Sequence, residues 1–157
     1  MLRAAEPGDF IFLHSVARNP DYARFVEDVS DAVLTDYLND PQYALVIWER
    51  DGAPKGFALF CGLGSPAGTV ELRRLALAEA GGGLGRAFIT DLRDYGFEVL
   101  GADCLWLDVV TDNPRAKHLY EDLGFQHEGT LRARWKRPAG DLADLHVLSI
   151  LRSEWQV

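Results

Sequence analysis

The sequence has 157 residues, of which 48% are hydrophobic and 25% charged, which is typical of a globular protein with one domain over residues 1–157. The formal net charge of −8, without a basic run, disfavours nucleic-acid binding and suits cationic partners such as amines. No apolar run is long enough to span a membrane and the start of the chain lacks a signal-peptide core, so we expect a cytoplasmic protein with no membrane partner.

The first sixty residues predict two helices followed by a hairpin. Apolar residues such as Val33 and Tyr37 recur at helical spacing, and the Asp51-Gly52-Ala53-Pro54 segment is a hairpin signal between two β-rich runs. The expected elements are a strand at 2–5, a helix starting at 7–9, a helix near 32–38, and strands at 43–50 and 56–61.

The central stretch predicts alternating strands and helices. The longer helix carries a core stripe at spacings of three and four, from Leu84 through Phe88 to Val99. The shorter helix has Asn113 as its N-cap and Gly124 as its left-handed stop. The expected elements are a strand at 69–78, a glycine turn at 81–86, a helix to about 99, a strand at 104–110 and a helix from 113 to 124.

The glycine turn between the central strand and the long helix is a candidate anion site. Gly81, Gly82, Gly83 and Gly85 allow the backbone to approach a phosphate closely, and Arg86 adds positive charge at the helix start. The P-loop and dinucleotide-binding patterns are not met, because no Lys-Ser or Lys-Thr follows and the glycine spacing differs. The alternative is a loop that only connects strand and helix.

The last third predicts two strands, at 126–134 and 142–151, joined by a turn at 138–141. Together the elements predict an α+β domain with a mixed, mostly antiparallel sheet. We interpret Cys61 and Cys104 as buried thiols and not a disulfide. The four histidines are too scattered for a metal site, and packing in the core is the preferred role for Trp48, Trp106, Trp135 and Trp155.

Over its central third the sequence resembles the GNAT acyl-CoA-dependent N-acetyltransferases. Segment 80–85 matches the family's glycine signature except at Ala80, where Gln or Arg is usual, and the link before it is shorter than the common form. The later motif of the family is matched in full by Asn113, Ala116, Leu119, Tyr120, Gly124 and Phe125. The resemblance implies a sheet splayed open in its middle with helices on both faces, and the last third looks like the ribosomal-protein and polyamine acetyltransferase branch.

The resemblance also implies a site for acetyl-CoA. In the family, the strand before the glycine turn is bulged, and its backbone pairs with the pantetheine arm. The resemblance therefore implies that the N–H of Leu75 donates a hydrogen bond to the acetyl oxygen as negative charge develops on it. The implied cofactor-binding residues are Leu75, Leu77, Gly81, Gly82, Gly83, Leu84, Gly85, Arg86 and Asn113.

Two side chains are candidate catalytic residues. Glu71 aligns with the carboxylate that part of the family uses as a general base, and Asp108 is the second choice. Tyr120 aligns with the phenol that protonates the departing thiolate. The alternatives are an ion pair between Glu71 and Arg73, and a core role for Tyr120.

The expected activity is transfer of an acetyl group from acetyl-CoA to a primary amine of a small molecule, a protein N-terminus or a lysine, by direct attack in a ternary complex. A catalytically silent acyl-CoA-binding sensor or scaffold is the rival, and Ala80 is compatible with it. A purely structural α+β domain is the third hypothesis. The sequence does not select the acceptor or the oligomeric state, and a homodimer is compatible with it.

Overall fold

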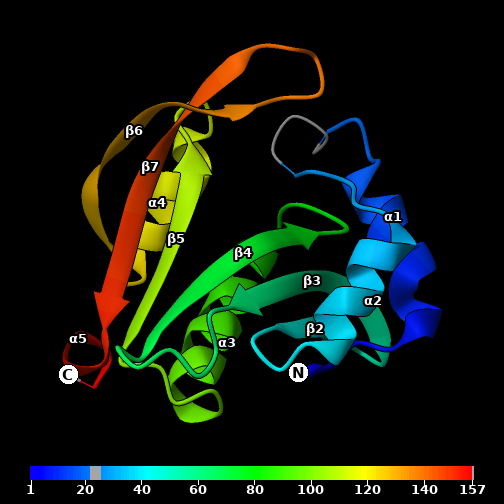
Figure 1. The fold of residues 1–157 in the computed structure, drawn as a ribbon, viewed down its shortest axis with the longest axis horizontal. Coiled ribbons are helices and arrows are strands. Elements are labelled where there is room, and N and C mark those ends of the chain that lie inside the picture. The colour runs from blue at the N-terminus through cyan, green and yellow to red at the C-terminus, as the bar shows by residue number, and fades with distance from the viewer. Residues whose placement is uncertain (22–25, 157) are drawn as a thin grey trace.

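A computed structural model describes residues 1–21 and 26–156. Seven strands form one sheet in the order β1-β2-β3-β4-β5-β7-β6, and Figure 1 shows helices on both sides of it. The strands are β1 (Leu2–Ala4), β2 (Ala44–Arg50), β3 (Ala53–Cys61), β4 (Thr69–Leu77), β5 (Cys104–Val110), β6 (Gln126–Lys136) and β7 (Leu142–Leu151). The helices are the 3₁₀ turn η1 (Pro7–Asp9), α1 (Phe10–Ala17), α2 (Asp31–Asn39), α3 (Leu84–Glu98), α4 (Pro114–Asp122) and α5 (Arg152–Trp155).

The sheet opens in its middle, between β4 and β5. These two strands are the parallel pair in an otherwise antiparallel sheet, and they pair only over Thr69–Glu71 and Cys104–Trp106. Beyond that short contact the strands diverge, so that the two halves of the sheet form a V (Figure 1). The mixed, mostly antiparallel and splayed sheet predicted from the sequence is therefore confirmed.

A bulge in β4 lies at the start of this opening. Phe57 pairs with Ala76 while Leu59 pairs with Arg73, so β4 holds one extra residue between the two pairs. Arg74 takes this position with a φ of 50°, which is uncommon for a residue other than glycine. A bulge bends its strand and re-aims the neighbouring side chains, and here it turns the second half of β4 away from β5.

The two faces of the sheet have separate cores. On one face, α3 and α4 pack Phe88, Leu92 and Tyr120 against strand residues such as Phe60 and Leu105. On the other face, α1 and α2 cover β2, β3 and β4, and this core includes the buried residues Leu13, Leu34, Tyr37, Ile47 and Leu59. The prediction of helices on both faces is confirmed, and the glycine turn and α1 lie on opposite sides of the sheet.

Some local expectations differ from the structure. The hairpin turn is tighter than predicted, because β3 already begins at Ala53 and only Asp51 and Gly52 have positive φ. Cys61 is buried and Cys104 half-buried, both as free thiols. The expected core role holds fully for Trp48 alone among the four tryptophans, since the other three, Trp106, Trp135 and Trp155, are half-buried.

Candidate active site

A cavity of about 540 Å³ lies between the glycine turn and α4. Its walls come from the second half of β4, the first turns of α3 and the inner side of α4, so it lies beside the opening of the sheet. We call it the glycine-lined cavity. Residues that line it include Leu75, Leu77, Ala80, Gly81, Gly83, Gly85, Arg86, Asn113, Ala116 and Tyr120.

The glycine turn takes a backbone conformation that other residues rarely adopt. Gly81, Gly82 and Gly83 all have positive φ, at 97°, 63° and 77°, and no atom lies within 4 Å of a Cβ added at any of them. The glycines are therefore required by the path of the backbone and not by crowding. Because Gly83 is the N-cap of α3, this path places the first turn of the helix against the cavity.

The N–H groups at this helix start are partly available to a ligand. The N–H of Leu84 donates to the carbonyl oxygen of Gly81 at 3.2 Å, so it is already used within the turn. Within the described chain, no backbone hydrogen bond is found for the N–H groups of Gly85 and Arg86. These two amides and the positive end of the α3 dipole favour an anion at this end of the cavity.

Arg86 lies at the rim of the glycine-lined cavity. Its guanidinium forms an ion pair with Asp122 of α4 at 3.1 Å, and both side chains are more than half exposed. An exposed pair of this kind is worth at most about 1 kcal/mol, so it can open readily for an anionic ligand. The pair also connects α3 and α4 across the cavity mouth.

The helix α4 presents Tyr120 at the inner end of the cavity. The first turn of α4 is held by the side chain of Asn113, which accepts a hydrogen bond from the N–H of Ala116 at 3.3 Å. The ring of Tyr120 is 6% exposed and packs against Phe125, with the ring centres 5.9 Å apart. Burial, and then the nearby charge of Asp108, raise the pKa of the phenol well above its usual value, so it stays protonated at neutral pH.

A second cavity, of about 300 Å³, lies on the other side of the opening. We call it the arginine-lined cavity. The two cavities share four lining residues, Val26, Leu75, Asn113 and Tyr120, so the two spaces meet where β4 and β5 have separated. The remaining walls include Glu27, Glu71, Arg73, Arg74, Asp108, Arg134 and Trp135. A molecule in one cavity can therefore meet a molecule in the other beside Tyr120.

The two candidate bases line the arginine-lined cavity. Glu71 accepts two hydrogen bonds from Nε and Nη2 of Arg73, at 2.9 and 3.0 Å, so the ion pair considered from the sequence exists. Desolvation raises the pKa of Asp108, the charge of Glu71 adds to this shift, and Arg73 opposes it. The charge of Glu71 therefore acts on Asp108, but only Glu71 forms hydrogen bonds with an arginine.

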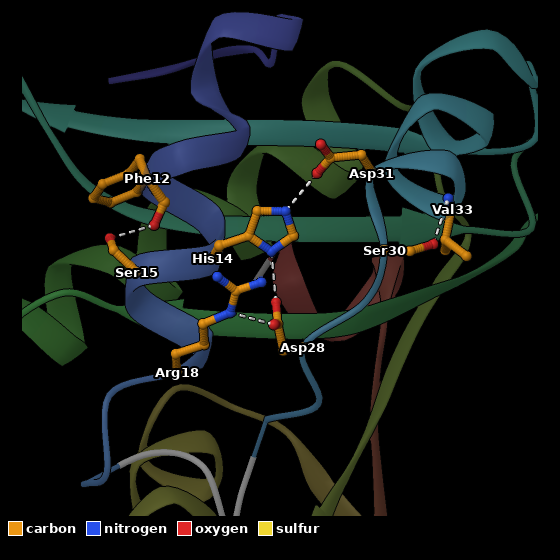
Figure 2. Close-up of polar contacts among 8 residues, drawn as sticks. All are labelled: Phe12, His14, Ser15, Arg18, Asp28, Ser30, Asp31 and Val33. Atoms are coloured by element: carbon orange, nitrogen blue, oxygen red, sulfur yellow. Dashed lines mark hydrogen bonds and ion pairs between the residues drawn. The ribbon is translucent and has the colours of Figure 1, made fainter.

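The α1–α2 connection reaches the same cavity and is anchored by a histidine. Figure 2 shows His14 of α1 between two carboxylates, with Nδ1 2.7 Å from Asp28 and Nε2 2.5 Å from Asp31. Arg18 donates from Nε to the other oxygen of Asp28 at 2.6 Å. These bonds raise the pKa of His14, Asp31 contributing most. These bonds also fix the position of Asp28, and the preceding residue, Glu27, lines the arginine-lined cavity.

Several residues of the arginine-lined cavity were not predicted from the sequence. Arg134 and Trp135 reach it from β6, while Arg74 and Glu27 reach it from the β4 bulge and the α1–α2 connection. Packing was the preferred role for Trp135, and its side chain does pack against a small core cluster, but it also forms part of the cavity wall. No local pattern marks these positions, because each depends on contacts between distant parts of the chain.

Comparison with known proteins identifies the family. The model of the Acetyltransferase (GNAT) family matches residues 6–125, which is most of the chain. The chain belongs to the GNAT acetyltransferase family. Its curated relatives include the spermidine N(1)-acetyltransferase of Vibrio cholerae, 27% identical over 83% of this chain and 80% of the relative. The spermidine N(1)-acetyltransferase of Escherichia coli K12 is 29% identical over 83% of this chain and 74% of the relative.

Solved structures agree with this GNAT assignment. The crystal structure of spermidine N-acetyltransferase from Vibrio cholerae in complex with CoA and spermine has a TM-score of 0.88 and 24% identity, covering 100% of this chain and 98% of that one. A chimera of the Vibrio cholerae and hSSAT enzymes matches with a TM-score of 0.85 at 25% identity, over 99% and 98% of the two chains. The chain is an acyl-CoA-dependent N-acetyltransferase, which transfers an acetyl group from acetyl-CoA to an amine.

Proposed function

We propose that this GNAT enzyme acetylates the primary amine of a small molecule in a ternary complex, with acetyl-CoA in the glycine-lined cavity and the amine in the arginine-lined cavity. The observation that carries the proposal is the meeting of the two cavities at Leu75, Asn113 and Tyr120. Each cavity is open to one reactant, and the shared residues lie where the reacting atoms would come together. Direct attack then needs no covalent intermediate on the enzyme.

The glycine turn and α3 bind the anionic end of the cofactor in this proposal. Acetyl-CoA supplies an activated acetyl group and a diphosphate. The free amides of Gly85 and Arg86, together with the α3 dipole, suit the diphosphate. The second half of β4, from Leu75 to Leu77, lines the same cavity and is turned away from β5, so its backbone is placed to pair with an extended arm.

Tyr120 and Leu75 handle the charge that develops during transfer. Leu75 directly follows the bulge, and its N–H is assigned to the acetyl oxygen. Tyr120 donates its proton to the departing sulfur. Its raised pKa keeps the phenol protonated at neutral pH, but the same shift makes it a weaker acid, so charge near the sulfur in the bound complex must lower the pKa again for the transfer.

Glu71 is the proposed general base. It lines the arginine-lined cavity, and Arg73 fixes the orientation of its carboxylate by two hydrogen bonds. An ammonium acceptor must lose a proton before it attacks, and Glu71 can take that proton directly or through a water molecule. Asp108, whose pKa is raised, is the second candidate on the facing strand.

Thiol release from acetyl-CoA with a panel of primary amines tests the proposal. We expect turnover with at least one amine and an acetylated product by mass spectrometry. Polyamines belong in the panel, because named relatives are spermidine N-acetyltransferases. Calorimetric binding of CoA without turnover on any amine would instead support the silent acyl-CoA-binding module.

The remaining predictions concern the chain as a whole. One continuous sheet of seven strands supports a single acetyltransferase domain over residues 1–157. No helix in the part of the chain that is described is long and apolar enough to cross a membrane. A cytoplasmic location, the absence of a nucleic-acid partner and a homodimer stay predictions, which cell fractionation, binding assays and analytical ultracentrifugation would test.

A further inference from the structure

The arginine-lined cavity does not share the negative charge of the chain. The whole sequence has a formal net charge of −8, but the described residues that line this cavity include equal numbers of acidic and basic side chains. The acidic residues are Glu27, Glu71 and Asp108, and the basic residues are Arg73, Arg74 and Arg134. A site for an acceptor with several positive charges is expected to hold an excess of carboxylates, because each buried or half-buried cation needs a partner.

Four of these six charges neutralise one another in pairs. Arg73 holds Glu71 through two hydrogen bonds, at 2.9 and 3.0 Å. Arg74 reaches Glu27 at 3.4 Å and also donates to the hydroxyl of Tyr37 at 3.1 Å. These pairs leave little net charge for a ligand to meet on the β4 side of the cavity.

Asp108 and Arg134 are the two charges that remain. Within residues 1–21 and 26–156, no hydrogen bond or ion pair is found for the side chain of either residue. They lie on different strands, Asp108 on β5 and Arg134 on β6, with β7 between them. The cavity thus offers one anionic and one cationic group to a ligand, at separate positions.

A bulge in β6 places Arg134 in the cavity wall. Leu131 pairs with Leu145 and Trp135 with Ala143, so β6 has two more residues than β7 in this interval. Ala133 takes a φ of 49°, and its N–H donates to Oδ1 of Asp144 at 2.7 Å. This side-chain bond fixes an irregular backbone, and such bulges commonly re-aim a side chain next to a functional site.

We propose that the acceptor is a small primary amine that also carries a carboxylate, with its ammonium group near Asp108 and its carboxylate on Arg134. The inference rests on the proposed function and names the acceptor class for that same site. The guanidinium group matches a carboxylate with two parallel hydrogen bonds. A linear polyamine has no anion for Arg134, and its second ammonium group would face a like charge.

The sheet register indicates how far the backbones of Asp108 and Arg134 are offset along the strands. Asp108 pairs with Val147 of β7, while Arg134 lies between the rows of Leu145 and Ala143. These rows are two to four residues from Val147, or roughly 7–14 Å along the strand. This spacing favours an amine and a carboxylate joined by a flexible chain over an α-amino acid.

Matched acceptors test the proposal directly. We would measure kcat/KM for ε-aminocaproate, for hexylamine, which lacks the carboxylate, and for spermidine. Wild-type enzyme is expected to prefer ε-aminocaproate over hexylamine by roughly ten- to a hundredfold, the range for one hydrogen bond to a charged group. The preference should be expressed mainly in KM, because the carboxylate lies away from the reacting atoms.

Variants then assign the preference to Arg134. Arg134→Gln should reduce the ratio of ε-aminocaproate to hexylamine toward one, and Arg134→Lys should restore part of it. Arg132→Gln is the matched control, since Arg132 is exposed on the same hairpin and does not line the cavity. The Arg132→Gln variant should have the same ratio of kcat/KM for ε-aminocaproate to that for hexylamine as the wild type.

Two other outcomes are distinguishable. Turnover that is best with spermidine, with no preference for the carboxylate in the wild type, would overturn the inference and leave the proposed function intact. The absence of turnover on every amine would overturn the proposed function, and the inference with it. The ratio in the wild-type enzyme decides the inference even if Arg134→Gln does not fold.

Discussion

The two cavities that meet at the opening of the sheet are built in different ways. Apart from Val26, the glycine-lined cavity is made of segments close in sequence, from β4 through α4, and its turn depends on the positive φ values of Gly81 to Gly83. The arginine-lined cavity collects residues from β4, β5, β6 and the α1–α2 connection. Its shape depends on bulges at Arg74 and Ala133, which are not glycines.

This difference indicates which of the two cavities carries the chemistry common to the family. A cavity made of neighbouring segments is specified by local sequence, so it can be kept while the rest of the chain changes. A cavity made by distant segments can be altered by changes in any one of them. We therefore expect the glycine-lined side to bind the common cofactor and the arginine-lined side to select the acceptor, and four predictions test this division.

The largest effect is expected at the junction of the cavities. Tyr120→Phe removes the proposed acid, so kcat should fall by about 10²–10⁴-fold while the KM for acetyl-CoA changes little. Thiol release under saturating substrates measures it. Tyr95→Phe is the matched control, because Tyr95 lies half-buried on α3 with its ring 5.7 Å from Phe60 and lines neither cavity. An unchanged kcat in Tyr120→Phe would exclude the acid role.

The next effect concerns the base. Glu71→Gln should lower kcat/KM by about a hundredfold, because the amide cannot accept the proton of the ammonium group. Asp108→Asn, on the facing strand, should mainly raise the KM for the acceptor amine. The pH profile of kcat/KM compares the two variants. A larger loss of kcat in Asp108→Asn than in Glu71→Gln would transfer the base role to Asp108, whose pKa is raised.

A smaller effect is expected on cofactor binding alone. Gly83→Ala forces a side chain into a left-handed conformation that costs about 1–2 kcal/mol, so the turn should shift and the Kd for CoA should rise about tenfold. Titration calorimetry measures the change. Gly8→Ala is the control, because Gly8 has open space around it, no positive φ and no place in the cavity. Equal Kd values in both variants would argue against the turn as the diphosphate site.

The smallest effect concerns the anchor of the α1–α2 connection. The pKa of folded His14 is raised, so its stabilising contribution is fully present below the unfolded pKa of about 6.5 and is lost as pH rises through the folded value. His14→Gln should therefore lower the free energy of unfolding by about 1 kcal/mol at pH 6 and by less at pH 9. The contribution is modest because Asp31 is 71% exposed. Urea unfolding at both pH values measures it, and a larger loss at pH 9 would contradict the assignment.

The sequence predicted the glycine-lined side well for a physical reason. Asn113 caps α4 and Gly124 ends it with a φ of 102°, and both roles follow from local backbone preferences. The strand over Cys104–Val110 was predicted with the same bounds. Hydrophobic periodicity and turn chemistry act over a few residues, so they can be read without knowledge of the fold.

The arginine-lined side could not be predicted in the same way. Nothing in the local sequence requires Arg74 or Ala133 to adopt a positive φ, since both are held there by pairing with neighbouring strands and, for Ala133, by Asp144. The ion pair of Glu71 and Arg73 was foreseen because the two residues are close in sequence. Arg134 and Trp135 lie far along the chain from the residues they join, and only the fold brings them together.

A crystal structure with acetyl-CoA would show whether the two cavities divide the cofactor and the acceptor as proposed. We predict that the diphosphate lies against the amides of Gly85 and Arg86, with the thioester sulfur within hydrogen-bond reach of the Tyr120 hydroxyl. The acetyl oxygen should lie at the N–H of Leu75, with the arginine-lined cavity open beside it. Acetyl-CoA bound elsewhere, or a Tyr120 hydroxyl directed away from the sulfur, would exclude the proposed mechanism.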